Sequence, residues 1–214
     1  MNIRRKTISM VIVAVLAAVL VIMTVTPIGY IPIGPLAVTI NMIPVAIGAV
    51  ILGPTGGAAL GLIFGLTSFA NAASVLGAPS IVGTTLFGVN PFLTFIVCVV
   101  SRVLEGWLAG LVGRLMNRTK MPKLLNYGIT GLLTAAFNTI FFMGLLIICF
   151  TPTLRANGWW QSGQNIFAFV AWFVGVNAVW ELVLSTVITA VVGFALYKAG
   201  LVVNYSRKTQ KTEV

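Results

Sequence analysis

The stretch "FIVCVVSRVLEGWLAG", residues 95–110, has the composition of a membrane-buried helix but carries two charged side chains, Arg102 and Glu105. Only three acidic residues occur among the 214 of the chain, and Glu105 is one of them. A charge at the centre of a bilayer costs about 2.5–3.5 kcal/mol on insertion scales, so such residues normally face a bundle interior or a cavity. The stretch therefore predicts a polar site inside a membrane protein.

The composition of the whole chain agrees with a membrane location. Hydrophobic residues make up 59% of the chain and charged residues only 7%, whereas soluble domains carry about 25% charged residues. Apolar runs reach the roughly 20 residues that span a hydrocarbon core. We therefore expect an all-α, multi-pass integral membrane protein with one membrane domain over residues 1–214, because little sequence is left for a soluble domain.

The residue types also exclude several classes of function. The chain has no histidine and no aspartate, so a Ser–His or Cys–His nucleophile and an aspartic mechanism are ruled out. It has no G-x-x-x-x-G-K-[ST] motif for ATP. Cys98 and Cys149 lie in apolar runs, which favours buried packing over a disulfide or a metal site. We expect no enzymatic activity, no cofactor and no metal.

Six membrane spans are predicted, over about 8–26, 41–53, 56–73, 91–116, 124–150 and 166–198. The net charge of +10 comes from short basic clusters beside apolar runs, which is typical of cytoplasmic flanks rather than of a nucleic-acid surface. With the N-terminus inside, the inner flanks hold Arg4, Arg5, Lys6, Arg114, Arg118, Lys120, Lys123, Lys198, Arg207, Lys208 and Lys211. Only Arg155 falls outside, so both termini are predicted to be cytoplasmic.

Three interrupted segments, about 27–40, 74–90 and 151–165, then lie on the outer face. They are rich in Gly, Pro, Asn, Thr and aromatic residues. Irregular backbone near membrane depth is tolerated only where protein or water buries it. These segments favour an outward-facing ligand cavity lidded by loops, and ordinary exposed loops are the alternative.

Arg102 is the central residue of the expected site. A guanidinium presents a planar, two-pronged donor to an anionic group, and Glu105 would orient it. Alternatively, Arg102 and Glu105 neutralise each other, since residues three apart share a helix face. The remaining candidate substrate-binding residues are polar or aromatic side chains of the other spans: Thr39, Asn41, Asn138, Asn177, Glu181 and Trp172.

Any one of these amides or hydroxyls is typical of interhelical hydrogen bonding. Together, in an otherwise apolar bundle, they favour a small-molecule pocket with a few placed polar groups. Small residues four apart are typical of close helix packing. Gly57, Gly61 and Gly65 form such a stripe, and we expect it to pack internally. Ala14 and Ala18 form another in the first span, where a partner protein and internal packing are both compatible with the pattern.

The Ala14/Ala18 pair, the block "IPIGPLAVTINMIPVAIGAVILGPTGGAALGLIFGLTSF" (residues 31–69) and the six-span layout resemble the substrate-binding S components of energy-coupling factor (ECF) vitamin transporters. The stretch "ILGPTGGAALGLIFGLTS" is most similar to the pantothenate-specific members. The resemblance implies a bacterial plasma-membrane protein that binds a vitamin from outside. It also implies docking on a membrane scaffold subunit driven by two ABC ATPases, with Ala14 and Ala18 at the scaffold and residues 27–40 as a lid.

The chemistry of the candidate residues leaves the ligand open. A pantothenate carboxylate suits Arg102, and its neutral polar groups suit the asparagines. The two glutamates instead suit a cationic or donor-rich vitamin, such as pyridoxine or a hydroxymethylpyrimidine precursor of thiamin, and riboflavin is a further alternative. A proton-coupled secondary transporter that uses Glu105 or Glu181 is the main rival, followed by a membrane assembly factor that binds no metabolite.

Overall fold

The structure, a computed structural model, describes residues 3–26, 29–33, 36–77 and 79–202. Parts of the predicted lid (27–28 and 34–35) and the C-terminal residues Arg207, Lys208 and Lys211 lie outside the described residues. The elements in chain order are α1 (Ile3–Val25), β1 (Tyr30–Ile33), β2 (Leu36–Thr39), α2 (Met42–Leu52), α3 (Pro54–Ala72), α4 (Ile81–Val89), α5 (Pro91–Phe95), the π-helix η1 (Ile96–Val100), α6 (Ser101–Met116), α7 (Lys123–Ala156) and α8 (Ile166–Lys198).

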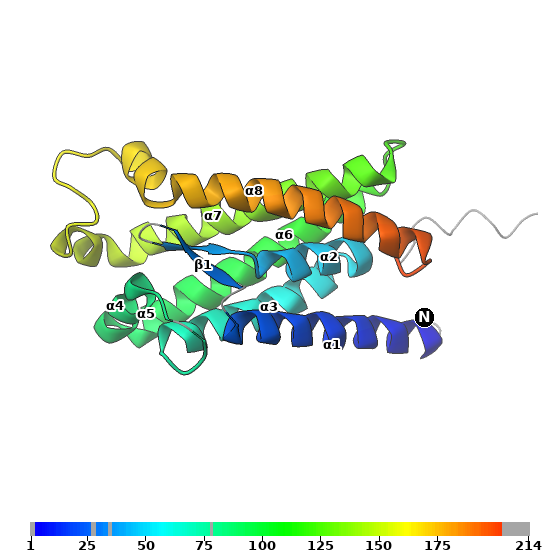
Figure 1. The fold of residues 1–214 in the computed structure, drawn as a ribbon, viewed down its shortest axis with the longest axis horizontal. Coiled ribbons are helices and arrows are strands. Elements are labelled where there is room, and N and C mark those ends of the chain that lie inside the picture. Colours follow the sequence, from blue (N-terminus) through cyan, green and yellow to red (C-terminus); the bar gives the residue numbers. More distant parts are fainter. Residues whose placement is uncertain (1–2, 27–28, 34–35, 78, 203–214) are drawn as a thin grey trace, which may run out of the picture.

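The predicted helical membrane architecture is confirmed. Within the described ranges, four helical stretches are long and apolar enough to cross a bilayer, namely Thr7–Val25, Pro91–Met116, Lys123–Ala156 and Ile166–Lys198. Helix α2 is also apolar, but its 11 residues extend only about 16 Å. The long helices run side by side along the long axis of the molecule (Figure 1), and their outward side chains, such as Ile148 and Val176, are exposed and apolar.

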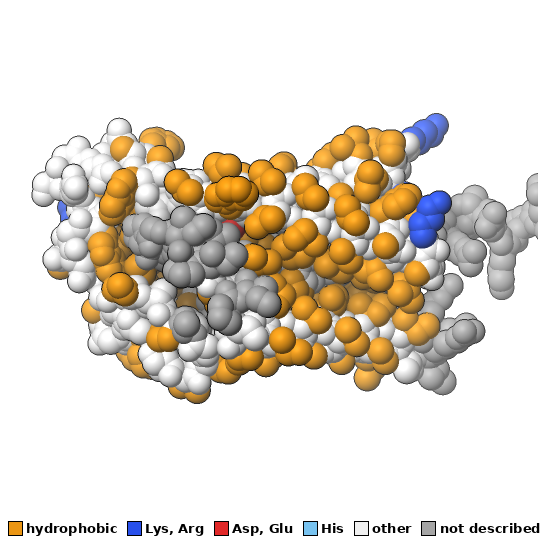
Figure 2. Space-filling view, in the orientation of Figure 1, with side chains coloured by type: hydrophobic (Ala, Val, Ile, Leu, Met, Phe, Trp, Pro, Cys, Tyr) orange, Lys and Arg blue, Asp and Glu red, His pale blue; other side chains and the backbone are white. Residues whose placement is uncertain are grey.

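The two ends of the bundle differ in charge. The turn between α6 and α7, the last turn of α8 and the start of α1 lie at one end, here called the basic end (Figure 1). Lys and Arg side chains project there, beyond a surface covered by hydrophobic side chains (Figure 2). The strand pair, α4 and the connection between α7 and α8 lie at the opposite end, called the hairpin end. Arg155, in the last turn of α7, belongs to the hairpin end.

Two predicted irregular connections contain helix, which corrects the prediction. Residues 74–90 include α4, which begins where the Ser80 hydroxyl accepts a hydrogen bond from the Gly83 N–H (3.0 Å). An N-cap of this kind satisfies an otherwise unpaired donor and starts a helix. Helix α7 runs on to Ala156 rather than ending at 150, because a kink at Phe150 (φ −128°, ψ 17°) accommodates Pro152.

The segment that precedes α2 forms an antiparallel hairpin instead of an irregular loop. Tyr30 pairs with Thr39, and Ile33 pairs with Leu36. The hairpin is tied to the end of α1, since the Gly29 N–H donates to the Met23 carbonyl (3.0 Å). A Cβ at Gly29 would overlap this same carbonyl oxygen, so only glycine allows the close contact.

The glycine stripe of α3 packs internally, as predicted, with Gly57 and Gly61 against α6 and Gly65 against η1. A Cβ at Gly57 would overlap the Gly106 carbonyl, and a Cβ at Gly61 would overlap the Arg102 carbonyl. A Cβ at Gly65 would come within 2.7 Å of the Val99 Cα. The missing side chains let the two backbones touch, and this contact sets the depth at which Arg102 enters the bundle.

Replacing Gly61 with Ala is expected to destabilise the protein because the α3 and α6 backbones must separate. Overpacking of this kind typically costs about 1–3 kcal/mol, which should lower the midpoint of thermal unfolding in detergent. Gly144→Ala is the matched control, since a Cβ at Gly144 meets nothing within 4 Å. An unfolding midpoint for Gly61→Ala equal to that of Gly144→Ala would contradict the tight packing.

Candidate functional site

A cavity of about 100 Å³ lies between the hairpin and the helices from α3 to α8. A single water needs only about 10–15 Å³, so the cavity has room for a small molecule. Its wall contains polar, aromatic and aliphatic side chains. The lining residues are Tyr30, Thr39, Ser68, Asn71, Ala72, Ser80, Val82, Gly83, Leu86, Thr94, Val97, Cys98, Arg102, Asn138, Thr139, Phe142, Met143, Val174, Asn177, Ala178 and Glu181.

Arg102 lines the cavity and is held by contacts on several sides. Its side chain is only 5% exposed, and its Nη1 donates to the Ser101 hydroxyl (2.8 Å) and to the Val97 carbonyl (3.5 Å). The guanidinium lies over the Phe142 ring (4.3 Å to the centroid) and within 5.2 Å of the Phe64 centroid. Cation–π contacts stabilise a desolvated guanidinium by about 2 kcal/mol.

One edge of this guanidinium stays available. Within the described part of the chain, the buried Arg102 Nε has no hydrogen-bond partner, and no ion pair holds the side chain. A buried, unpaired donor is costly. Nε–H and the neighbouring Nη2 form the planar fork that binds a carboxylate through two parallel hydrogen bonds, so this edge can receive an anionic group.

The π-helix directly before Arg102 was not predicted. Residues Ile96–Val100 form it inside an otherwise continuous helix from Pro91 to Met116. A π-turn holds one more residue than an α-turn, and such bulges are frequent at functional sites. It rotates the following side chains relative to those before it. No signal in the sequence would have located this turn.

Glu105 does not reach the cavity wall. It lies one turn beyond Arg102 on α6 and is 0% exposed. Neither carboxylate oxygen has a hydrogen-bond partner among the residues that the structure describes. The alternative of a self-neutralising Arg102–Glu105 pair is therefore not formed in this arrangement.

Glu181 connects the hairpin to α8. Its Oε1 accepts a hydrogen bond from the backbone N–H of Thr39 (2.7 Å), and its Oε2 accepts one from Nδ2 of Asn138 (3.5 Å). Thr39 closes the second strand, so this bond holds the end of the hairpin against the cavity. The Asn138 Oδ1 has no partner within the described residues and is available as an acceptor.

Of the eight residues predicted to bind substrate, five line the cavity: Thr39, Arg102, Asn138, Asn177 and Glu181. The other three are Asn41, Glu105 and Trp172, which the cavity does not include. Asn41 is buried towards α1, where its Nδ2 donates to the Thr24 hydroxyl (3.3 Å). Trp172 is 54% exposed on the outside of α8, because it is five residues from Asn177 and so on a different helix face.

Sequence reasoning missed Tyr30, Ser68 and Phe142. Phe142 follows Asn138 by four residues and so shares its face of α7, a spacing that could have identified it. Tyr30 comes from the hairpin, where only the folded structure brings it to Arg102. Burial raises the pKa of the Tyr30 hydroxyl, and the nearby Arg102 guanidinium acts in the opposite direction. The group remains a neutral phenol at physiological pH, able to donate a hydrogen bond.

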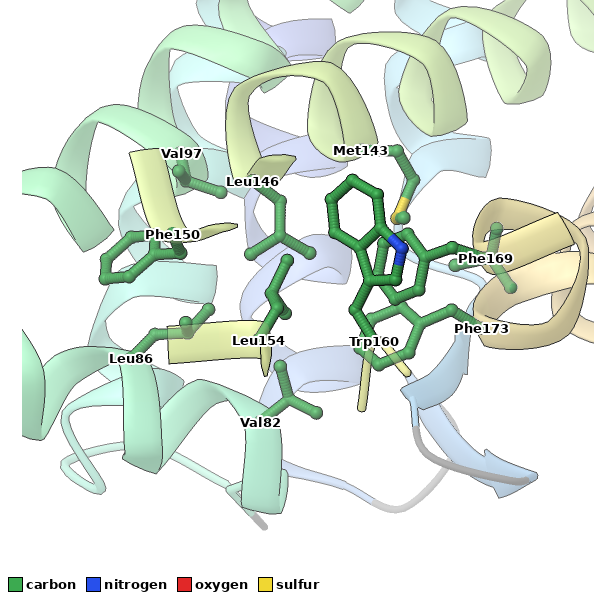
Figure 3. Packing of buried hydrophobic residues seen from close by; sticks show 11 residues of the cluster. Val82, Leu86, Val97, Met143, Leu146, Phe150, Leu154, Trp160, Phe169 and Phe173 are labelled. Carbon is green, nitrogen blue, oxygen red and sulfur yellow. The ribbon is translucent and has the colours of Figure 1, made fainter. Parts of the chain in front are cut away.

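An apolar cluster closes the cavity towards the hairpin end. Leu86 of α4, Val97 of η1 and Met143 of α7 pack together with further members of the cluster from α7 and α8 (Figure 3). Trp160 stacks on Phe169 with ring centroids 4.8 Å apart. Several cluster members also line the cavity, so a bound molecule would meet aliphatic groups as well as polar ones.

These features define a multi-pass helical membrane protein with an internal cavity lined by both polar and apolar side chains. The family described as "ECF transporter, substrate-specific component" matches residues 9–193, and the chain belongs to that family. The resemblance to S components is thereby confirmed, as is the prediction of a transport protein rather than an enzyme.

Two relatives are similar over most of the chain. The pantothenate transporter PanT of Leuconostoc mesenteroides subsp. mesenteroides is 31% identical over 198 residues, which cover 89% of this chain and 93% of the relative. The pantothenic acid transporter PanT of Lactococcus lactis subsp. cremoris is 29% identical over 171 residues, which cover 77% and 80%.

Loss of the Glu181 carboxylate is expected to loosen the hairpin. In Glu181→Ala the Thr39 N–H loses its acceptor, so hydrogen–deuterium exchange of the peptide that contains Thr39 should become faster. Glu181→Gln keeps an acceptor oxygen and should show a smaller change. Exchange in Glu181→Ala at the wild-type rate would mean that the hairpin is held by other contacts.

Proposed function

We propose that this chain is the substrate-binding component of an ECF-type importer in a bacterial plasma membrane and that its ligand is pantothenate. The observation that carries the proposal is Arg102, a buried cation at the cavity wall whose Nε edge has no partner among the described residues. Family membership and the two relatives named as pantothenate transporters support it.

Pantothenate matches both the polar and the aliphatic side chains of the cavity wall. It carries a carboxylate, an amide, two hydroxyls and a pair of methyl groups on one carbon. The carboxylate would pair with Arg102. The hydroxyls and amide would bond with Asn138, Asn177 and Glu181, and the methyl groups would pack against aliphatic side chains such as Leu86 and Val174.

The proposed topology has six spans, with α2 and α3 together completing the set, and with both termini in the cytoplasm. The support is the gathering of Arg and Lys at the basic end of the bundle, since cytoplasmic flanks carry the excess of basic residues. The cavity then opens outward, and the hairpin and α4 act as its lid.

The proposed partners are a membrane scaffold subunit and two ABC ATPases, which would energise uptake. Helix α1 offers the surface for the scaffold: Ala14 and Ala18 lie on one face and both point away from the bundle. A stripe of small residues lets a partner helix approach closely.

Binding of pantothenate by the purified protein tests the ligand directly. Wild type should bind pantothenate in preference to pyridoxine, hydroxymethylpyrimidine and riboflavin. Arg102→Ala should weaken binding by about 30-fold or more, because truncating one partner of a buried charge pair costs about 2–5 kcal/mol. Calorimetry on the folded proteins in detergent measures both the ligand preference of wild type and the affinity of Arg102→Ala.

Arg102→Lys is the control that separates charge from geometry. It keeps the cation but not the planar fork, so its affinity should lie between those of wild type and Arg102→Ala. Full affinity in Arg102→Ala would remove Arg102 from the site. Uptake by the protein alone in liposomes, driven by a proton gradient, would instead support the secondary transporter.

Enlarging the Ala14/Ala18 face should separate binding from transport. Ala14→Trp is expected to leave pantothenate affinity unchanged and to abolish uptake by cells that carry the complete importer, because the bulky side chain would hold the scaffold away. Val15→Trp is the matched control, since Val15 is exposed about a quarter-turn away on the same helix. Uptake that survives in Ala14→Trp would place the docking surface elsewhere.

A further inference from the structure

The buried acid Glu105 has no role in the site described above, yet it lies beside its central cation. Its side chain is fully buried, and both carboxylate oxygens lack hydrogen-bond partners among the described residues. An ionised carboxylate without a partner in such a place is far more costly than a neutral acid. With the Arg102 guanidinium turned to the cavity, Glu105 is therefore expected to be protonated.

The two side chains are close enough to meet without movement of the backbone. Arg102 and Glu105 are three residues apart on α6, a spacing that puts Cβ atoms about 5–6 Å apart. Among the described residues, the arginine side chain makes its hydrogen bonds through Nη1, to Ser101 and Val97. Its other close contacts are with the Phe142 and Phe64 rings, which do not fix the direction of the guanidinium edge. A change of rotamer would exchange those bonds for a bond to the Glu105 carboxylate.

The other charged or titratable groups around Glu105 are few. Helices α2 and α3 pack against α6 and carry no Asp, Glu, Lys, Arg, Cys or Tyr. On α7, which also packs against α6, such groups occur only towards the two ends of the helix: Lys123, Tyr127, Cys149 and Arg155.

On α8, Glu181 faces both Arg102 and Glu105, but its oxygens already accept hydrogen bonds from Thr39 and Asn138. Tyr30 and Cys98 lie near Arg102 from the hairpin and from η1.

We propose that Glu105 is the internal counter-ion of Arg102: its carboxylate pairs with the guanidinium when the ligand leaves, and it takes up one proton when an anionic ligand binds. This inference rests on the proposed function, because it takes the ligand to be an anion held by Arg102. The charges balance at each step. Binding replaces a Glu105 carboxylate with the ligand's carboxylate on the same guanidinium, and the displaced carboxylate receives a proton from solvent.

The exchange keeps the membrane interior near the same net charge with and without ligand. It also gives Arg102 a partner in both situations, so release does not leave an unpaired buried cation. The Glu105 carboxylate then competes with the ligand for the guanidinium, which favours release of the ligand.

Proton uptake can be counted by isothermal titration calorimetry of the full-length wild-type protein with pantothenate. The binding enthalpy is measured at one pH in phosphate and in Tris, two buffers whose ionisation enthalpies differ. The difference between the two binding enthalpies gives the number of protons taken up. We expect about one proton per ligand at a pH at which Glu105 is ionised in the free protein. Affinity should then fall as pH rises, by up to about tenfold per pH unit. Above about pH 6 the carboxylate of pantothenate stays ionised, so the ligand itself adds no proton.

Glu105→Gln identifies the proton acceptor. This variant should bind pantothenate at least as tightly as wild type, with no proton uptake and with an affinity that does not change with pH. Glu181→Gln is the matched control: its affinity changes, but proton uptake should persist, because Glu105 is still present.

Three results would overturn the proposal. These are wild-type binding without proton uptake at any pH from about 6 to 8.5, proton uptake that persists in Glu105→Gln, and proton uptake that is lost in Glu181→Gln. The first and third need no folded Glu105→Gln protein. All three results would be obtained with a protein that still binds pantothenate, so they would not contradict the proposed function. If wild type did not bind pantothenate at all, the proposed function would be overturned as well.

Discussion

The desolvation of one guanidinium is the constraint on which this structure depends. Arg102 is buried in a bundle whose outer surface is apolar, so the protein itself must supply its contacts. The hydroxyl of Ser101 and the carbonyl of Val97 accept hydrogen bonds from its Nη1, and the Phe142 and Phe64 rings lie against the guanidinium. Among the described residues, these groups leave the Arg102 Nε without a hydrogen-bond partner, and Arg102 lines the cavity. Arg102 is thus a buried cation with an unpaired donor at the cavity, and the proposed recognition of an anion depends on this donor.

The remaining architecture places that cation and closes the space around it. Gly61 lets α3 touch the backbone of α6 at Arg102, and the π-turn Ile96–Val100 rotates the residues that follow it. The hairpin contributes Tyr30 and Thr39 to the cavity wall and is held there by Glu181, which lies 142 residues from Thr39 in the chain. The acid that holds the end of the hairpin therefore also lines the cavity. In the proposed function, this shared residue would link ligand binding to the position of the hairpin.

Much of the site could be recognised in the sequence, because polar residues in apolar spans must face inward. That rule alone selected Arg102, Asn138, Asn177 and Glu181, all of which line the cavity. The rule gave wrong predictions for polar residues that are buried in the bundle but do not line the cavity. Asn41 is buried against α1, and Glu105 is buried beside the cavity rather than in it. Local pattern does not distinguish these cases, because both kinds of residue avoid lipid for the same reason.

The sequence by itself determined the class of protein, the four long apolar helices and the end of the bundle at which positive charge gathers, because hydropathy and charge act locally along the chain. Tertiary structure alone decided which polar side chains meet. It paired the Thr39 amide with Glu181 and placed Tyr30 near Arg102, and it left Glu105 close to the guanidinium without contact. Those outcomes depend on the close approach of α3 to α6 and on a π-turn in the middle of a span. Both are set by packing between distant segments, for which the linear pattern has no signal.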